Sequence, residues 1–225
     1  MTEYSLHVDI KEWYSGSSNQ VEVKVDDFVI DVINKEGLLI EIQTRNLSAI
    51  KNKLKKLLKN NKVRLVYPIA KIKWIVYMSE CGELVKKRKS PKKGKLTDLF
   101  VELVHLPRLI CHENFSFEVL LIEQEELRCN DGKGSWRRKG VSIKNRKLIK
   151  VFDSTVFEDK SDFLTTLPDD LEKVFTNKIL AKKMKISLRL AQKITYCLRK
   201  MNALTVVGKK RRELLFKITQ EQSRR

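Results

Sequence analysis

The chain lacks the features that mark membrane, secreted and zinc-binding proteins. No stretch of its 225 residues approaches the roughly 20 consecutive apolar residues that span a bilayer. The opening MTEYSLH lacks the basic and then apolar layout of a secretion signal. Four cysteines, Cys81, Cys111, Cys129 and Cys197, include no CxxC pair, which argues against structural zinc. We therefore expect a cytoplasmic protein with reduced thiols and no membrane partner.

Acidic residues are scarce beside basic ones. Lys and Arg number 47 against 28 Asp and Glu, which gives a formal net charge of +19 and a pI of about 9.8. A surplus of this size points to nucleic acid or an anionic surface, whereas a merely soluble, lysine-rich protein is the alternative. The hydrophobic fraction of 42% is enough for one large domain or two modest ones.

The first third of the chain changes its hydrophobic period in a regular order. Apolar residues at helical spacing predict two helices, and alternating or short apolar runs predict the strands. The order is a helix at 3–14, three antiparallel strands at 21–25, 28–33 and 38–43, a helix at 46–59, and a strand at 63–67 closed by Pro68. The last strand, helix and strand resemble a crossover, which predicts two parallel neighbouring strands.

Two carboxylates, Asp31 and Glu41, interrupt the second and third strands. A buried carboxylate is costly unless a partner or a cation relieves it. Pairing across the turn at 34–37 can place both on one face, with Gln43 two residues further along that face. Such oxygens suit Mg²⁺ or Mn²⁺, which would polarise a phosphate and activate a bound water. Alternatively, Asp31 accepts backbone hydrogen bonds and Glu41 forms an ion pair with Arg45 or Lys71.

Asp31, the short turn and the strand bearing Glu41-Ile42-Gln43 resemble the PD-(D/E)xK nuclease superfamily of restriction enzymes and junction resolvases. The resemblance covers the first third of the chain and implies an α/β (α+β) protein with a restriction-endonuclease-like αβββαβ core and a mixed sheet. It implies that Asp31 and Glu41 bind the metal, together with Glu3 or, less well, Glu12 from the first helix. The implied reaction is phosphodiester hydrolysis in DNA.

One position departs from the family. Gln43 stands where the family usually has lysine, so a stabilising cation would have to come from Lys51 or Arg45, and Gln43 would position the water. Tyr4 and His7 on the first helix could also approach the metal. A nuclease fold retained only for DNA binding is the alternative. Many nucleases of this fold act as dimers, which leaves a homodimer open.

After residue 160 the predicted elements become helices followed by a hairpin. We therefore place the boundary between domains 1–160 and 161–225 there. Thr176 and Ser187 are suited to cap two helices, 176–184 and 187–201, joined by a short turn. A ribbon at 203–207 and 214–218 follows, with a basic tip. This order resembles the winged-helix family, which implies DNA binding. Protein contacts or dimerisation, with the lysines as ordinary solubility charges, are the alternative. The expected contacts are Arg189, Gln192, Lys193 and Tyr196 on the second helix, and Lys209, Lys210, Arg211 and Arg212 on the wing.

Further basic segments lie between the two resemblances. The segment 86–95 is too charged to pack and predicts an exposed loop or hairpin tip, while 71–78, 96–106 and 115–122 predict a strand, a helix and a strand. Residues 130–150 give no clear element. Lys89, Arg137 and Arg138 could clamp a duplex, and Trp136 could stack on an unpaired base or simply cover a core edge. Together these features predict a magnesium-dependent, nucleoid-associated DNA nuclease, with RNA as a weaker option for the substrate.

Overall fold

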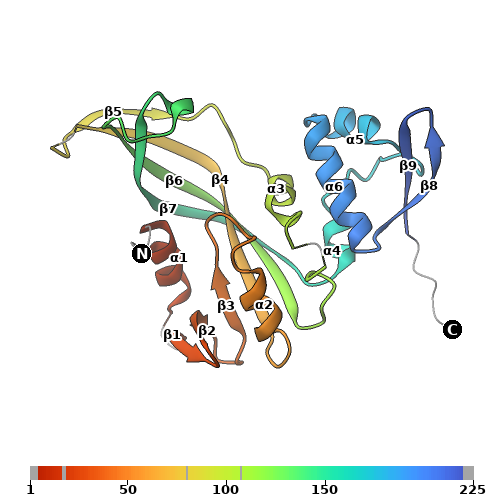
Figure 1. Cartoon of the computed structure of the whole chain (residues 1–225), viewed down its shortest axis with the longest axis horizontal. Coiled ribbons are helices and arrows are strands. Elements are labelled where there is room, and N and C mark those ends of the chain that lie inside the picture. The colour runs from red at the N-terminus through yellow and green to blue at the C-terminus, as the bar shows by residue number, and fades with distance from the viewer. Residues whose placement is uncertain (1–4, 17–18, 80, 107, 220–225) are drawn as a thin grey trace. The chain divides into compact units, whose positions relative to one another are not determined.

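The computed structural model describes all residues except 1–4, 17–18, 80, 107 and 220–225 (Figure 1). Helices and strands mix along the chain, which divides into two compact units. The first comprises Met1–Arg45, Arg64–Leu96 and Glu118–Thr155, and the second comprises Asn46–Val63, Thr97–Phe117 and Val156–Arg225. The last segment of the second unit begins close to the boundary expected at residue 160. The two earlier segments of that unit are a division that the sequence did not reveal.

The first elements occur in the predicted order. They are α1 (Ser5–Tyr14), β1 (Gln20–Val25), β2 (Phe28–Ile33), β3 (Leu39–Ile42), α2 (Lys51–Leu57) and β4 (Val63–Met78). β1 pairs with β2 and β2 with β3, both antiparallel. β3 and β4 are neighbours, as the crossover predicted, and in Figure 1 they run in the same direction.

A seven-stranded mixed sheet forms the framework of this region. Its order is β1-β2-β3-β4-β6-β7, with β5 (Leu84–Lys89) paired antiparallel to β4, and with β6 (Phe115–Asn130) and β7 (Val141–Phe157) beyond it. Arg64 lies 3.6 Å from Glu118 and Lys73 lies 3.8 Å from Glu126, so positions advance together along β4 and β6. Those two strands are therefore parallel.

The strands are longer than expected. Pro68 was predicted to close a strand, yet β4 continues through it to Met78. The carbonyls of Val66 and Ala70 accept from Gln43 and Gly94 on one edge of β4. Residues two apart point to the same edge. Pro68 therefore turns its missing N–H to the gap between these two partners, where a strand tolerates proline. The residues on either side of Pro68 form one strand, not two.

The helix predicted at 46–59 is shorter, because α2 begins only at Lys51 after a series of turns. Part of the predicted basic loop is a strand, since β5 occupies Leu84–Lys89 with all six residues exposed. β6 extends eight residues beyond the predicted end at Ile122, and β7 fills the segment that gave no clear element. A short 3₁₀ turn, η2 (Trp136–Arg138), lies between β6 and β7.

The core of the first unit lies between α1 and one face of the sheet. Leu6 and Ile10, one helical turn apart, are buried against Val32, Ile40 and Ile42. Val66 of β4 and two β6 residues, Leu120 and Ile122, complete this cluster. The even-numbered residues of β2 and β3 therefore form the apolar face. Their odd-numbered neighbours, which include both carboxylates, are not part of this apolar cluster.

The second unit contains helices and a two-stranded ribbon. Its elements are α2, then α3 (Leu99–Leu103), preceded by the 3₁₀ turn η1 (Leu96–Asp98), then α4 (Lys160–Leu164), α5 (Asn177–Met184), α6 (Leu188–Lys200), β8 (Leu204–Lys210) and β9 (Glu213–Ile218). The rings of Phe157 and Phe163 stack in one part of its core, with their centroids 4.5 Å apart. Thr176 and Ser187 cap α5 and α6 through their side chains, as predicted. Among the described residues, no helix has the length and apolar character needed to cross a membrane.

Candidate functional site

The pairing of β2 with β3 ends one position before Asp31 and Glu41. Val32 pairs with Ile40 and Ile33 with Leu39. Extended by one position, the same register brings Asp31 opposite Glu41. Directly opposite residues of an antiparallel pair project to the same face, with Cβ atoms about 5 Å apart. The two carboxylates that the sequence singled out therefore belong to one face and to one end of the β2–β3 pair.

The backbone ladder stops where these residues meet. The amide of Ile42 donates to Oδ2 of Asp31 at 2.8 Å, so a side-chain oxygen takes the place of a strand carbonyl. This is the backbone hydrogen bond that the alternative interpretation of Asp31 anticipated. It also fixes the carboxylate at the edge between the two strands, because a charged acceptor strengthens such a bond.

His7 of α1 reaches the same oxygen. Its Nε2 lies 3.3 Å from Oδ2 of Asp31, and both side chains are less than one-fifth exposed. The sequence suggested that His7 could approach the carboxylates, and the structure places it there. Glu12 is exposed on α1, five residues on, and points about 140° away around the helix axis. Glu3 and Tyr4 lie outside the described residues.

Glu41 and Gln43 extend the face along β3. Glu41 is only 2% exposed, whereas Gln43 is half-buried and donates its backbone N–H to the carbonyl of Val66 at 2.9 Å. Gln43 is therefore anchored to β4, two residues beyond Glu41. The alternative ion pairs of Glu41, with Arg45 or with Lys71, stay predictions.

These donors fit a metal that takes few protein ligands. Mg²⁺ usually binds one or two carboxylates and retains several waters. Asp31 and Glu41 can provide those two carboxylates. Within the described part of the chain, no group of three or more His, Cys, Asp or Glu residues is arranged to hold a metal. A site closed by protein ligands alone is therefore not formed by these residues.

A basic pocket adjoins the end of β3. Arg45 lines it together with Lys133, Gly134, Arg138, Ser142, Ile143 and Arg146, around a volume of about 320 Å³. Arg45 was expected on the helix that follows β3, but it precedes α2 by six residues. None of the seven lining residues is acidic, so the pocket is suited to an anion.

A buried carboxylate orders the cations beside this pocket. Glu126, 2% exposed, accepts from Arg128 Nε at 2.9 Å and from Arg146 Nε at 3.2 Å, with Lys73 at 3.8 Å. Burial opposes the ionisation of Glu126, but the hydrogen bonds and nearby positive charges lower its pKa below the ordinary value. Burial also lowers the pKa of Lys73, and the charge of Glu126 opposes that shift.

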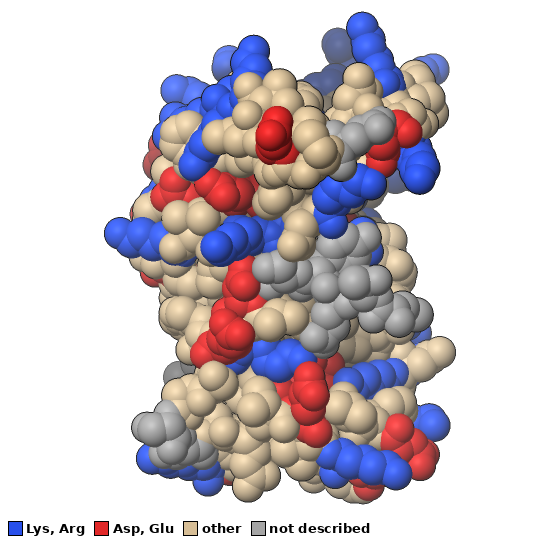
Figure 2. Space-filling view, turned by 90° about the vertical axis from the view of Figure 1, so that its left-hand side faces the viewer, with Lys and Arg blue, Asp and Glu red and all other residues tan. Residues whose placement is uncertain are grey.

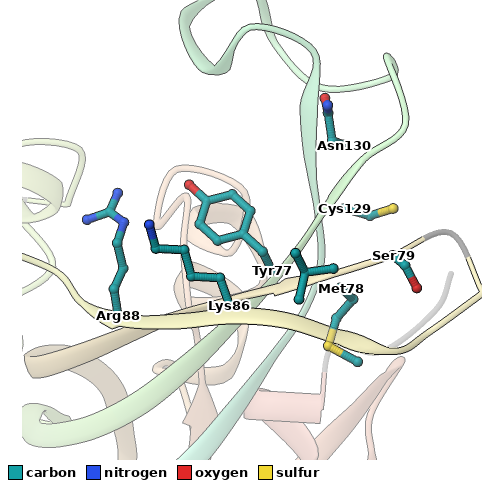
Figure 3. A pocket seen from close by; sticks show the side chains of 8 residues that line it. Tyr77, Met78, Ser79, Lys86, Arg88, Cys129 and Asn130 are labelled. Carbon is teal, nitrogen blue, oxygen red and sulfur yellow. The ribbon is translucent and has the colours of Figure 1, made fainter.

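Residues at the end of β4, along β5 and at the end of β6 line a second pocket of about 380 Å³ (Figure 3). Tyr77 stands beside Lys86 and Arg88 in this view, while Cys129 and Asn130 come from β6. A hydrogen bond from Arg88 lowers the pKa of Tyr77, and Arg128 acts in the same direction while burial opposes it. Apart from the basic run of β5, no sequence pattern indicated this pocket.

Basic side chains gather at the upper end of the face drawn in Figure 2, the end that carries the β4–β5 and β6–β7 hairpins in Figure 1. Lys89 ends β5, and its ammonium lies 5.6 Å from the centre of the Trp74 ring. Arg137 similarly lies 5.4 Å from the ring of Trp136. Trp136 is 83% exposed, so it does not cover a core edge.

Lys51, a predicted catalytic cation, lies in the second unit, whereas Asp31 and Glu41 lie in the first. It opens α2 and lines a pocket of about 320 Å³. The other residues of this pocket are Lys55, Val104, His105, Leu106, Arg108, Leu109, Tyr196 and Lys200. Tyr196 was predicted to contact DNA, so the structure unites residues to which the sequence assigned separate roles.

The remaining predicted DNA contacts differ in their surroundings. Lys193 donates to the carbonyl of Val101 in α3 at 2.9 Å, so its ammonium is engaged within the unit. Arg189 and Gln192 are exposed on α6. The four basic residues predicted at the tip of the ribbon are exposed as well: Lys209 and Lys210 end β8, and Arg211 and Arg212 form the turn to β9.

The chain matches the family described as Domain of unknown function (DUF8091) over residues 4–158. It is also 33% identical, over 173 residues, to a Treponema pallidum (strain Nichols) protein named "Uncharacterized protein". That similarity spans 77% of this chain and 69% of the relative. No solved structure matches the chain. The extent of the family match shows that this protein belongs to the DUF8091 family.

Proposed function

We propose that this protein is a divalent-metal-dependent DNA nuclease that hydrolyses phosphodiester bonds. The observation that carries the proposal is the β2–β3 register, which, extended by one position, brings Asp31 and Glu41 to the same end of the strand pair. Asp31 and Glu41 would hold Mg²⁺ or Mn²⁺, and Gln43 would position the attacking water. The bound metal would polarise the phosphate and make water a stronger nucleophile.

The order of elements supports a PD-(D/E)xK-like core. The chain runs through α1, β1, β2, β3, α2 and β4, and the first four strands are neighbours in that order within a mixed sheet. His7 holds the carboxylate of Asp31 from α1. A hydrogen-bonding partner of this kind orients a ligating carboxylate.

The second unit supports a winged-helix module that binds DNA. Phe175 forms an isolated bridge with Phe216 of β9, so the order is helix, short strand, two helices and a two-stranded ribbon. Residues 161–225 contain 16 Lys and Arg against 6 Asp and Glu. This charge favours phosphate contact. Arg189 and Gln192 would read bases, while Arg211 and Arg212 at the ribbon turn would contact phosphates in a nucleoid-associated role.

A second candidate is a DNA-binding protein on an inactivated nuclease fold. Gln43 favours it, because the family lysine is missing from the strand that bears Glu41. The hydrogen bond from the Ile42 amide to Oδ2 of Asp31 also favours it, since this bond gives the carboxylate a structural role that needs no metal. The two candidates share the DNA surface and differ only in metal binding and hydrolysis.

Cleavage of plasmid and single-stranded DNA in Mg²⁺ or Mn²⁺ tests the proposal. Asp31→Asn and Glu41→Gln should each lower the cleavage rate by more than about 100-fold, beyond the usual effect of losing an outer partner of a metal ligand. Asp27→Asn and Glu36→Gln, exposed in the turns that flank β2, are matched controls and should cleave as the wild type does. A wild type as inert as both variants would contradict hydrolysis.

A further inference from the structure

The basic pocket at the end of β3 has the composition of a phosphate site. Four of its seven lining residues are cations, namely Arg45, Lys133, Arg138 and Arg146. The acid nearest in sequence, Asp131, is bonded to the pocket wall, because it accepts from Oγ of the lining residue Ser142 at 2.9 Å. Lys144 Nζ, 2.6 Å from the same carboxylate, balances its charge. These bonds and that of the Lys133 amide lower the pKa of Asp131, so it keeps its charge and its partners.

The loop that builds the pocket is fixed before any ligand arrives. The Gly134 amide donates to the Gly140 carbonyl at 2.7 Å and closes the loop. A Cβ at position 134 would overlap the carbonyl of Val141, so only glycine fits there. Arg138 Nε donates to the same carbonyl at 3.1 Å, and Glu126 holds Arg146. Cations ordered in this way bind an anion at a smaller entropic cost.

An aromatic platform stands on the same loop. Trp136 is two residues before Arg138, is 83% exposed, and has the Arg137 guanidinium 5.4 Å from its ring centre. A tryptophan ring left open to solvent and flanked by cations suits base stacking, which does not depend on sequence. The bases of an intact duplex are stacked on one another, so such a platform selects unpaired bases.

We propose that this pocket binds a phosphate of an unpaired DNA strand while the neighbouring base stacks on Trp136. This inference rests on the proposed nuclease function and assigns its substrate class: single-stranded DNA, or duplexes with an unpaired segment. Arg45 links the pocket to the carboxylates, since it lies four residues after Glu41 of β3 and two after Gln43. The DNA strand would thus be held by its phosphate backbone beside the carboxylates that carry out hydrolysis.

Fluorescence anisotropy of a labelled oligothymidylate, with EDTA present to prevent cleavage, tests the inference. Trp136→Ala should weaken binding by about tenfold, the usual effect of removing one stacking platform. Lys133→Ala should weaken binding and reduce the salt dependence by about 0.7 in log–log slope, as expected for one phosphate contact of a single strand. Binding of the blunt duplex should be unchanged in both variants.

Two substitutions in the first unit act as controls. Trp13→Ala removes another exposed tryptophan, and Lys147→Ala removes an exposed lysine of β7 that does not line the pocket. Both should bind oligothymidylate as the wild type does. Quenching of tryptophan fluorescence by the strand should persist in Trp13→Ala and be lost in Trp136→Ala, which identifies the stacked ring in folded protein.

Four outcomes would overturn the inference. Trp136→Ala could bind the strand as the wild type does, or lose duplex binding equally. Inorganic phosphate could displace the strand at equal concentration, which would mark a site for free phosphate. An oligouridylate could bind more tightly than the DNA strand, which would make RNA the ligand. The nuclease proposal fails separately, if the strand binds as expected but wild type, Asp31→Asn and Glu41→Gln all leave DNA intact.

Discussion

The carboxylate of Asp31 has two roles at the edge of the β2–β3 pair. It replaces a strand carbonyl by accepting from the Ile42 amide, and it faces Glu41 across the register. The first role is structural and was anticipated as an alternative; the second is the basis of the proposed metal site. One side chain can serve both, because a carboxylate has two oxygens and about four acceptor positions.

His7 is expected to tune this site without being essential to it. Because it lies 3.3 Å from Asp31 Oδ2, His7→Ala should lower the DNA cleavage rate by about 10- to 100-fold, the usual effect of an outer-shell partner. Glu12→Gln is the control on the same helix and should leave the rate unchanged. Equal losses in both variants would show that the residues act only through the stability of α1.

Substitution of Glu126 is expected to lower the free energy of unfolding strongly. Glu126→Gln leaves Arg128, Arg146 and Lys73 crowded around a neutral group, and loss of a buried partner costs about 3 kcal/mol or more of unfolding free energy. Urea denaturation at neutral pH measures this loss. Glu125→Gln removes an exposed ion pair with Lys87 and should cost less than about 1 kcal/mol.

The pH dependence of that difference has a definite sign. The pKa of Glu126 is lowered in the folded state, so its stabilising effect is complete above the unfolded value of about 4.3. The effect disappears as the pH falls through the lower, folded value. The unfolding free energies of wild type and Glu126→Gln should therefore converge as the pH falls into the acid range. A gap that stayed constant from neutral pH into acid would contradict this role.

At the scale of elements, strong local patterns were predictable and tertiary effects were not. The β1–β3 meander follows from the local alternation of apolar and polar residues. The N-caps of α5 and α6 follow from the side chains of Thr176 and Ser187. The continuation of β4 through Pro68 depends on a gap between two partners that are distant in sequence. β7 is half exposed along its length and rich in basic residues, so its sequence carries little strand signal; pairing with β6 defines it.

The loop between β6 and β7 provides a test at this scale. Gly134→Ala would force a Cβ into the Val141 carbonyl, and overpacking of this kind costs about 1–3 kcal/mol. The variant should lose stability in urea denaturation and bind oligothymidylate more weakly. Gly16→Ala is the control, since a Cβ there meets no atom within 4 Å. Unchanged stability of Gly134→Ala would show that the loop is not rigid.

At the scale of the whole molecule, the composition predicted an anionic partner but not the division of the chain. Segments 46–63 and 97–117 join the C-terminal residues in the second unit, and no local pattern marks such a discontinuous unit. For the same reason, Lys51 was assigned to the carboxylates although it belongs with Tyr196 and Lys200. The candidate carboxylates were predictable because they lie on adjacent strands of one hairpin.

The net charge of +19 makes any DNA binding salt-dependent, and the ribbon turn should account for a defined part of it. The double variant Arg211→Ala/Arg212→Ala should lower the log–log salt slope of duplex binding by about 0.9 for each phosphate that these arginines neutralise. Lys35→Ala/Lys59→Ala changes the net charge equally at exposed sites elsewhere. An equal reduction in both double variants would show a diffuse charge effect instead of a specific interaction at the turn.

Calorimetric titration of the DNA-free protein with Mn²⁺ tests the central claim most directly, because it separates an active site from an inactivated one. We expect uptake of the ion by the wild type, by Asp27→Asn and by Glu36→Gln, and loss of that uptake in Asp31→Asn and in Glu41→Gln. Binding that survives in both of these last two variants, or a wild type that takes up no ion, would contradict the claim.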